Sequence, residues 1–281
     1  MIVVEKYRGK KVGVFGLGIT GVSAVRSLLA SGATVYAFDD RDNLVAGIEE
    51  SFEQANTQSY ASWPWDELDA LILSPGVPHC DPGAHRIIGF AKKHNCLIIT
   101  DIELLFLAHP EATYIGITGT NGKSTTTSLI HHICQAAGID CYVGGNIGTP
   151  VLDLEPPKHD KTVYIIEMSS YQLELLDQFV CNIAVFLNLT PDHLDRHHTM
   201  KAYHLAKERI FKGQQQGSDH AFIGYDDDYT RKSYEHISHA VAFSSQVIPA
   251  EGIAVIDGEI IDHRLGDQVR IPIGDIPHLK G

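Results

Sequence analysis

The stretch GITGTNGKST, residues 116–125, decides how the second half of the chain is interpreted. It follows an apolar run and opens a segment with helical periodicity. A glycine-rich turn at such a place directs backbone N–H groups and the positive end of the helix dipole at an anion. Its end matches the phosphate-binding pattern G-x-x-x-x-G-K-[ST], but the first glycine of that pattern would fall at Ile117. The stretch therefore predicts a phosphate site with a different loop; the alternative is an accidental Gly-Lys-Ser in an ordinary turn.

Apolar runs that alternate with helix-like segments predict an α/β fold on both sides of this stretch. KVGVFG, LGITGVSAVRSLLASG and TVYAFDD, within residues 11–40, give a strand, a helix and a strand. Such alternation is typical of a parallel, doubly wound sheet. The pattern starts again after Asp101, so we expect two domains, 1–101 and 102–281. Further strands are expected at 69–76, 96–101, 112–118, 162–170, 182–190, 220–225, 240–245, 252–257 and 268–273, and helices at 84–95, 123–138 and 200–212.

The composition, 44% hydrophobic and 20% charged residues, suits a soluble globular protein. Apolar runs stay well below the roughly 18 residues of a membrane span, and the first residues do not resemble a signal peptide. The formal net charge of −13 argues against a nucleic-acid-binding surface, because such surfaces are usually basic. The five cysteines are scattered without a C-x-x-C pair, which favours the reducing cytoplasm.

GLGITG, residues 16–21, fits the pattern G-x-G-x-x-G at a turn from strand to helix, and Asp39 ends the next strand. This spacing is typical of a Rossmann dinucleotide site, with a pyrophosphate at the helix N-terminus and the acid on a ribose hydroxyl. Alternatively, the glycines only allow a tight turn and close packing of helix against strand. The motif does not identify the nucleotide.

A magnesium-dependent phosphoryl site also needs a carboxylate near the lysine and serine of the loop. Glu167 stands where the apolar strand VYII ends, as a Walker-B acid would. Lys123 could bridge phosphates, and the hydroxyl of Ser124 could bind Mg²⁺. The alternative for Glu167 is a carboxylate at a strand end that faces solvent.

NLTPDHLDRHH, residues 188–198, gathers histidines and an aspartate at His193, Asp195, His197 and His198. A zinc site is conceivable, but the cysteine and glutamate spacing of hydrolytic zinc motifs is missing, so only one of these residues is assigned a metal role. Lys207, in AYHLAKERIF, is on local sequence alone an ordinary solvated helix lysine.

Several of these segments together resemble one family. GTNGKST, GGNIGTP, EMSSYQLE, NLTPDHLDRH and YHLAKERIF are similar to the Mur ligases of bacterial peptidoglycan synthesis. GLGITG with FDDR, SPGV and TDIELL resembles the branch that adds D-glutamate. The match runs in order from about residue 8 to residue 281. Because the loop in this family is G-[ST]-N-G-K-[ST], the resemblance also explains the missing glycine at Ile117.

The resemblance implies an ATP-dependent acid–amino-acid ligase of the cytoplasm that acts in cell wall biogenesis. ATP would phosphorylate the carboxylate of UDP-N-acetylmuramoyl-L-alanine, and the amine of D-glutamate would attack the acyl phosphate. The implied fold is a Rossmann-like domain followed by a P-loop-type ATP-binding domain. The implied cofactors are ATP and Mg²⁺ at two sites. We expect a monomer without nucleic-acid or membrane partners.

The resemblance also implies a set of site residues. Lys123, Lys207, His193 and Asn146 would be catalytic, with Lys123 on the β- and γ-phosphates of ATP. The ATP loop would comprise Gly119, Thr120, Asn121, Gly122, Lys123, Ser124 and Thr125. One Mg²⁺ would be held by Ser124 and Glu167, and the second by His193 and a carbamylated Lys207. Asn146, Ser169, Gln172 and His193 would position the sugar-peptide or its carboxyl. Ile19, Thr20, Asp39, Asp40, Arg41 and Gly76 would surround the uridine diphosphate.

The sequence departs from the family pattern in two places. Asp40 stands where the family often has a hydroxyl residue. After LKG the family continues with a His-Asn segment near the adenine and a domain that receives the amino acid, so we expect the first two domains here, the second incomplete. The alternatives are the muramate–alanine ligase, which usually has His in place of Asn121, folylpolyglutamate synthase, which lacks the uridine-nucleotide domain, and a nucleotide-binding module without turnover.

Overall fold

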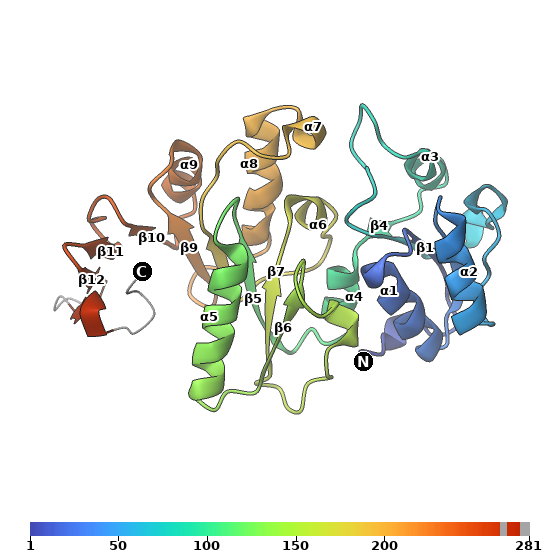
Figure 1. Ribbon diagram of the computed structural model, residues 1–281, viewed down its shortest axis with the longest axis horizontal. Helices are drawn as coiled ribbons and strands as arrows, with labels where there is room; N and C mark the ends of the chain where they lie inside the picture. Colours follow the sequence, from blue (N-terminus) through green and yellow to red (C-terminus); the bar gives the residue numbers. More distant parts are fainter. Residues whose placement is uncertain (265–268, 276–281) are drawn as a thin grey trace.

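The structure is a computed structural model, and it describes residues 1–264 and 269–275. Figure 1 shows two sheets arranged along the long axis of the molecule, the first built from the N-terminal part and the second from the remainder. The expected α/β fold is confirmed, with a Rossmann-like first part and a P-loop-type second part. None of the helices among the described residues is long and apolar enough to cross a membrane.

The first sheet has four parallel strands in the order β2-β1-β3-β4. Its strands are β1 (Lys11–Phe15), β2 (Thr34–Phe38), β3 (Ala70–Leu73) and β4 (Ile98–Ile99). The helices of this part are α1 (Ile19–Ala30), α2 (Asp42–Ser51) and α3 (Arg86–Lys93), with short 3₁₀ helices η1 (Glu5–Tyr7), η2 (Tyr60–Ser62) and η3 (Trp65–Glu67). The helix α4 (Asp101–Ala108) connects this part to the second sheet.

The second sheet has nine strands in the order β13-β12-β11-β10-β9-β8-β5-β7-β6. The strands β5 (Thr113–Thr118), β6 (Cys141–Gly145), β7 (Val163–Glu167), β8 (Ile183–Phe186), β9 (His220–Gly224), β10 (Ala240–Ser244) and β11 (Gly252–Ile256) are parallel, whereas β12 (Glu259–Asp262) and β13 (Val269–Pro272) are antiparallel. The helices are α5 (Lys123–Ala136), α6 (Ser170–Glu174), α7 (Leu194–His197), α8 (Met200–Glu208) and α9 (Asp228–His236), with 3₁₀ turns η4 (Val151–Asp153), η5 (Arg209–Phe211) and η6 (Ile273–Asp275).

Buried apolar runs explain the centre of the second sheet. Every residue of β7 is buried, and all but the first residue of β5 are. Continuous apolar runs of this kind are typical of parallel strands that are covered on both faces. The strand β6 was not predicted, because its sequence CYVGG ends in two glycines that weaken the strand signal.

One hydrophobic core extends through both parts of the chain. The same buried cluster contains Val14 of the first sheet and Tyr114 and Tyr164 of the second. The carboxylate of Glu103, on α4, is 1% exposed and accepts hydrogen bonds from the backbone N–H groups of residues 177–179. These contacts fix the two sheets relative to each other. The division into two domains near Asp101, the first residue of α4, stays a prediction.

Candidate functional site

The loop between β5 and α5 has the backbone conformation that its glycines predict. Gly119 has φ +152° and Gly122 has φ +82°, values that residues with a side chain rarely adopt. Gly122 caps α5, and Lys123 is the first helical residue. The first backbone N–H groups of α5 have no partner within the helix, so the loop carries the donors and the dipole that a phosphate requires.

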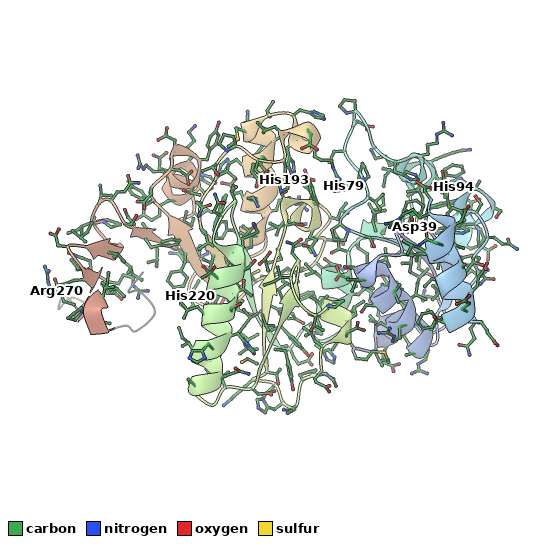
Figure 2. The ribbon with its side chains drawn as sticks, in the orientation of Figure 1. Asp39, His79, His94, His193, His220 and Arg270 are labelled. Atoms are coloured by element: carbon green, nitrogen blue, oxygen red, sulfur yellow. The ribbon has the colours of Figure 1, made fainter. Side chains whose placement is uncertain are left out.

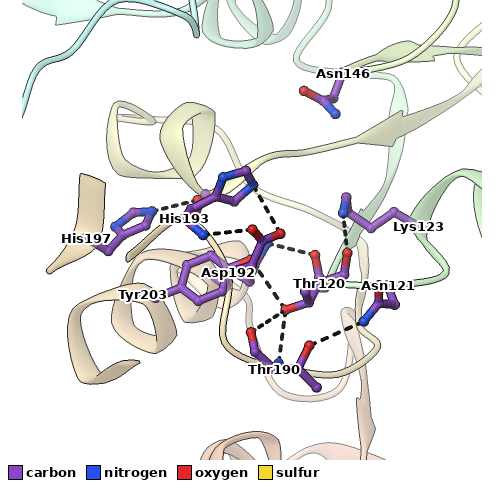
Figure 3. A network of polar contacts seen from close by, with 12 residues as sticks. Thr120, Asn121, Lys123, Asn146, Thr190, Asp192, His193, His197 and Tyr203 are labelled. Carbon is purple, nitrogen blue, oxygen red and sulfur yellow. Dashed lines mark hydrogen bonds and ion pairs between the residues drawn. The ribbon is translucent and has the colours of Figure 1, made fainter. Parts of the chain in front are cut away.

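A second loop, which follows β8, holds this phosphate loop in place (Figure 3). The backbone N–H of Asn121 donates to Oδ1 of Asn188 at 2.9 Å, and Nδ2 of Asn188 donates to the carbonyl of Asn121 at 3.0 Å. The backbone N–H of Thr190 donates to Oγ1 of Thr120 at 3.1 Å. These partners lie about 70 residues apart in the sequence, and sequence reasoning missed Asn188 and Thr190 as anchors for that reason. The phosphate loop is therefore preformed.

Glu167 ends β7 beside this loop and is 1% exposed. Its Oε2 accepts a hydrogen bond from Oγ of Ser124 at 2.8 Å, and its Oε1 accepts one from Nδ2 of Asn146 at 2.9 Å. The solvent-facing alternative for Glu167 is wrong. A hydroxyl and a carboxylate oxygen at this distance form an oxygen donor set of the kind that Mg²⁺ prefers.

Lys207, on α8, is 2% exposed, so it is not the solvated helix lysine that its local sequence suggests. Its Nζ donates to the carbonyl of Gly119 at 2.8 Å and lies 4.9 Å from the centre of the Tyr203 ring. Burial and then the positive charge of Lys123 lower the pKa of Lys207 to about 7. About half of these amines are consequently neutral at neutral pH, whereas an ordinary lysine is almost fully protonated.

The histidines of the loop after β8 differ in how deeply they are buried. His193 is exposed, has φ +51°, and caps α7. His197 is 5% exposed and packs against Tyr171, with ring centres 5.3 Å apart. Asp195 and His198 are exposed. His193 is the member of the cluster that lines a cavity together with Lys123 and Lys207.

Two adjoining cavities form a central groove between the sheets. The first, of about 560 Å³, is lined by the GLGITG turn, residues 39–41, the segment 74–78 and Gln172. The second, of about 300 Å³, is lined by Lys123, Ser169, His193 and Lys207. Both include Pro75, Gly76 and Asn146, so the groove runs from the first glycine turn to the phosphate loop. Figure 3 shows Lys123, Asn146 and His193 around one open region.

The central groove brings together all of the substrate residues that the family resemblance implies. Ile19, Thr20, Asp39, Asp40, Arg41, Gly76, Asn146 and Gln172 line its first cavity, and Asn146, Ser169 and His193 line its second. Ser169 and Gln172 also form a capping box at the start of α6, because Oγ of Ser169 and Oε1 of Gln172 accept each other's backbone N–H. Their positions are thus fixed by the helix that they begin.

Asp39 is held beneath the glycine turn. Its carboxylate accepts the backbone N–H of Leu17 at 2.7 Å and two side-chain N–H groups of Arg41 at 2.9 and 3.0 Å. Burial acts to raise the pKa of Asp39, but the hydrogen bonds from Arg41 and Leu17 outweigh it and keep the pKa below its ordinary value. The carboxylate therefore orders the turn and orients Arg41.

His85 and Phe15, which sequence reasoning did not single out as site residues, complete this end of the groove. His85 lies 2.9 Å from Oδ2 of Asp40 through Nε2, and its ring stacks on Phe15 with centres 4.5 Å apart. Nδ1 of His85 accepts the backbone N–H of Ile87, so Nε2 carries the proton that Asp40 accepts. His85 and Asp40 are 45 residues apart in the sequence, and the local sequence around His85 indicates only that a helix begins there.

A third cavity, of about 600 Å³, lies beside Asn121 and Gly122, towards strands β9 to β12. Its lining includes the apolar side chains of Leu187, Phe243 and Val255. The phosphate loop consequently has one cavity beside it that continues the central groove and another that faces the last strands.

The fold and the loop together define a protein of the P-loop-containing α/β class. Comparison with known families matches residues 10–99 to the MurD-like N-terminal domain of Mur ligases and residues 117–262 to the Mur ligase middle domain. The chain belongs to the Mur ligase family.

Its curated relatives include proteins named UDP-N-acetylmuramoylalanine–D-glutamate ligase. The relative from Wolbachia pipientis is 45% identical over 228 residues, which cover 81% of this chain and 43% of the relative. The relative from Agrobacterium fabrum is 41% identical over 290 residues, which cover 100% of this chain and 60% of the relative. The chain thus spans about half the length of the relatives it matches.

Among solved structures, the chain is similar to a UDP-N-acetylmuramate:L-alanyl-gamma-D-glutamyl-meso-diaminopimelate ligase from Neisseria meningitides. The TM-score is 0.60 and the identity is 15%, over 94% of this chain and 87% of that chain. At this identity the likeness supports the fold alone.

Proposed function

We propose that this chain provides the uridine-nucleotide and ATP sites of an ATP-dependent ligase that joins D-glutamate to UDP-N-acetylmuramoyl-L-alanine. The reaction would proceed through an acyl phosphate and belong to peptidoglycan precursor synthesis. The observation that carries the proposal is the central groove, which leads from the glycine turn beside the first sheet to Lys123 at the start of α5. The names of the curated relatives support the same reaction.

The ATP site would be the phosphate loop, residues 119–125. Membership of the Mur ligase family supports ATP and Mg²⁺ as cofactors. Lys123 is half-buried at the N-terminus of α5, where its charge and the backbone N–H groups could bind the β- and γ-phosphates. Ser124 and Glu167 would hold one Mg²⁺, which, when bound, neutralises charge on the phosphoryl oxygens. The cavity beside Phe243 offers space for the nucleoside.

The uridine diphosphate would occupy the first cavity of the groove, and the sugar-peptide would point toward the second. Ile19 is 79% exposed and lines the first cavity beside the glycine turn, so a ligand ring could cover its side chain. Arg41 is held by Asp39 at the cavity wall and could donate to phosphate oxygens. Asn146, shared by both cavities, would place the reacting carboxyl near Lys123.

Lys207 would be carbamylated and would hold a second Mg²⁺ together with His193. The neutral amine attacks carbon dioxide, forms an N–C bond and loses a proton, which leaves an anionic oxygen ligand. Burial of Lys207 and its lowered pKa support the proposal, because they increase the neutral fraction of the amine. Both residues line the same cavity.

A second candidate is a nucleotide-binding module without turnover of its own. It is supported by the phosphate loop and the central groove, which offer two nucleotide sites within this chain. We also propose a monomer with small-molecule partners; the net charge of −13 supports the absence of nucleic-acid partners, and light scattering tests the oligomeric state.

The test is phosphate release from ATP in the presence of UDP-N-acetylmuramoyl-L-alanine and Mg²⁺. It is measured with D-glutamate, L-glutamate, L-alanine and glycine, on this chain and on a full-length protein that contains it. The ligase proposal predicts release that depends on D-glutamate in the full-length protein. A parallel assay replaces the nucleotide by UDP-N-acetylmuramate, and release there with L-alanine would show another ligase of the family. Nucleotide binding without release in either protein would support the module.

A further inference from the structure

His79, Cys80 and Glu174 form a cluster outside the residues that line the central groove. His79 and Cys80 lie on the segment between β3 and α3, and Glu174 is the last residue of α6. Nε2 of His79 is 2.9 Å from Oε2 of Glu174, and Sγ of Cys80 is 3.5 Å from the same oxygen. One donor atom from each of the three residues lies within 4.8 Å of the other two.

A fourth donor lies next to this cluster. Nδ1 of His197 is 3.6 Å from Oε1 of Glu174, while Nε2 of His197 lies 2.8 Å from Oγ of Ser170. That hydrogen bond fixes the orientation of the His197 ring and turns Nδ1 toward Glu174. A hydrogen bond on the ring nitrogen that faces away from the metal commonly orients a metal-ligating histidine.

One ring nitrogen of His79 lacks a hydrogen-bond partner in the part of the chain that the structure describes. The residue is 8% exposed, and its buried Nδ1 has no hydrogen-bond partner among the described parts of the chain. Among the described residues, its polar contact runs through Nε2 to the carboxylate of Glu174. A cation would bind Nε2, the nitrogen that faces Glu174, and the proton of the neutral ring would then lie on Nδ1.

We propose that His79, Cys80 and Glu174 bind a borderline-soft divalent cation of the Zn²⁺ type. Nδ1 of His197 lies beyond 4.8 Å of at least one of these three donors, so it takes the fourth position only if its ring moves inward. Bonds of about 2.0 Å to nitrogen or oxygen and about 2.3 Å to sulfur, at tetrahedral angles, separate neighbouring ligand atoms by roughly 3.3–3.5 Å. The distance of 3.5 Å from Cys80 to Glu174 meets this requirement, and the pair of His79 and Glu174, at 2.9 Å, has to open by a few tenths of an ångström.

The donor set separates this site from the proposed Mg²⁺ site. A thiolate and imidazoles favour Zn²⁺, whereas Mg²⁺ prefers oxygen ligands such as those of Ser124 and Glu167. The two sites should therefore respond to different ions.

The position of the cluster gives the cation a structural consequence. In Figure 2, His79 lies between Asp39 of the first part and His193 of the second. The segment of His79 and Cys80 also carries Pro75 and Gly76, which line both cavities of the groove. A cation that joins this segment to α6 would tie the two walls of the groove together.

The test is a Co²⁺ titration of the metal-free, tag-free protein, followed by absorption spectroscopy. The proposal predicts one Co²⁺ per chain, a thiolate-to-cobalt charge-transfer band and the intense d–d bands of a tetrahedral site. Zn²⁺ should remove these bands by competition, and a large excess of Mg²⁺ should leave them unchanged. Saturating Zn²⁺ should raise the Tm by roughly 5 °C.

Cys80→Ser should lose the charge-transfer band and weaken binding at least tenfold, as should His79→Gln. The matched control is Cys134→Ser, because Cys134 and Cys141 are close enough to each other to form a competing thiol pair. This variant should bind like the parent protein. The proposal is overturned if the parent protein shows no stoichiometric tetrahedral Co²⁺ spectrum, or if that spectrum survives Cys80→Ser and disappears in Cys134→Ser. The parent titration decides alone if a variant fails to fold.

Discussion

Lys207 is the residue whose chemistry depends most on where the fold places it. Its amine is enclosed by the carbonyl of Gly119 and the ring of Tyr203, and Lys123 lies close enough to lower its pKa further. Lys201, an exposed lysine on the same helix, is a suitable control. The contrast between the two lysines can be measured directly.

Carbamylation of Lys207 should follow pH through the pKa of the amine. Because this pKa is lowered to about 7, the neutral amine prevails at pH 8 and the ammonium at pH 6. We expect a carbamate signal in ¹³C NMR with labelled bicarbonate at pH 8 and its loss at pH 6. Lys207→Ala should abolish the signal and most turnover of the full-length protein, and a short-chain carboxylic acid should restore part of that turnover. A signal retained in Lys207→Ala, or lost in Lys201→Ala, would contradict the assignment.

Lys123 should contribute to ATP chemistry and little to binding of the uridine nucleotide. Lys123→Ala in the full-length protein should reduce turnover roughly 10²–10³-fold, the loss typical of one preorganised electrostatic donor. The affinity for UDP-N-acetylmuramoyl-L-alanine should stay within about twofold, because the glycine turn belongs to the other sheet. Steady-state kinetics and calorimetry measure the two effects separately. Turnover close to that of the parent protein would show that the loop does not bind the transferred phosphate.

At the scale of elements, the turn between β1 and α1 requires glycine at position 21, where the backbone of the turn packs closely. A Cβ added at Gly21 would lie 1.9 Å from the carbonyl oxygen of Gly16, whereas one added at Gly47, within α2, would meet nothing within 4 Å. Gly21→Ala should therefore lower the free energy of unfolding by about 3 kcal/mol or more, and Gly47→Ala should raise it by about 0.5–1 kcal/mol. Thermal unfolding of both variants checks the prediction, and equal effects would contradict it.

Asp101, the first residue of α4, should make the free energy of unfolding depend on pH. Burial raises the pKa of Asp101 from 3.8 to about 6, and both of its carboxylate oxygens are buried without a hydrogen-bond partner among the described residues. The folded state then binds more protons than the unfolded state between pH 4 and 6, so this group's contribution to stability falls as the pH rises through that window. Between pH 4 and pH 7, the free energy of unfolding of Asp101→Asn should rise by up to about 3 kcal/mol relative to that of the parent protein. If the Tm of Asp101→Asn and the Tm of the parent protein follow parallel pH profiles, the prediction is wrong.

Elements with a strong local signal could be predicted from sequence, and contacts between distant segments could not. The strands β1, β2, β5 and β7 and the helices α1 and α5 follow from apolar runs punctuated by glycine. β6 was missed because of its two glycines, and β12 because a two-residue turn divides one apolar stretch. The predicted strand at 182–190 ends at Phe186, since the residues after it turn to hold the phosphate loop.

The candidate site shows the same limit. Glu167 and the phosphate loop carry motifs, so their neighbourhood could be predicted. The burial of Lys207, the pair of His85 and Asp40 and the anchors at Asn188 depend on tertiary packing, which no local pattern encodes.

At the scale of the whole molecule, one continuous core joins the two sheets, which lie along the long axis (Figure 1), and the proposed nucleotide sites line one groove. The central claim is that the glycine turn of the first sheet binds a uridine nucleotide and not NAD, although its spacing fits either. We favour the uridine nucleotide because the first cavity adjoins the cavity that Lys123, the first residue of α5, helps to line.

The most direct test is a calorimetric titration of this chain with UDP-N-acetylmuramoyl-L-alanine and, separately, with NADH. We expect one site for the uridine nucleotide and at least tenfold weaker binding of NADH. Arg41→Ala should weaken the first interaction, because Arg41 lies at the wall of the first cavity. Tighter binding of NADH than of UDP-N-acetylmuramoyl-L-alanine would contradict the account.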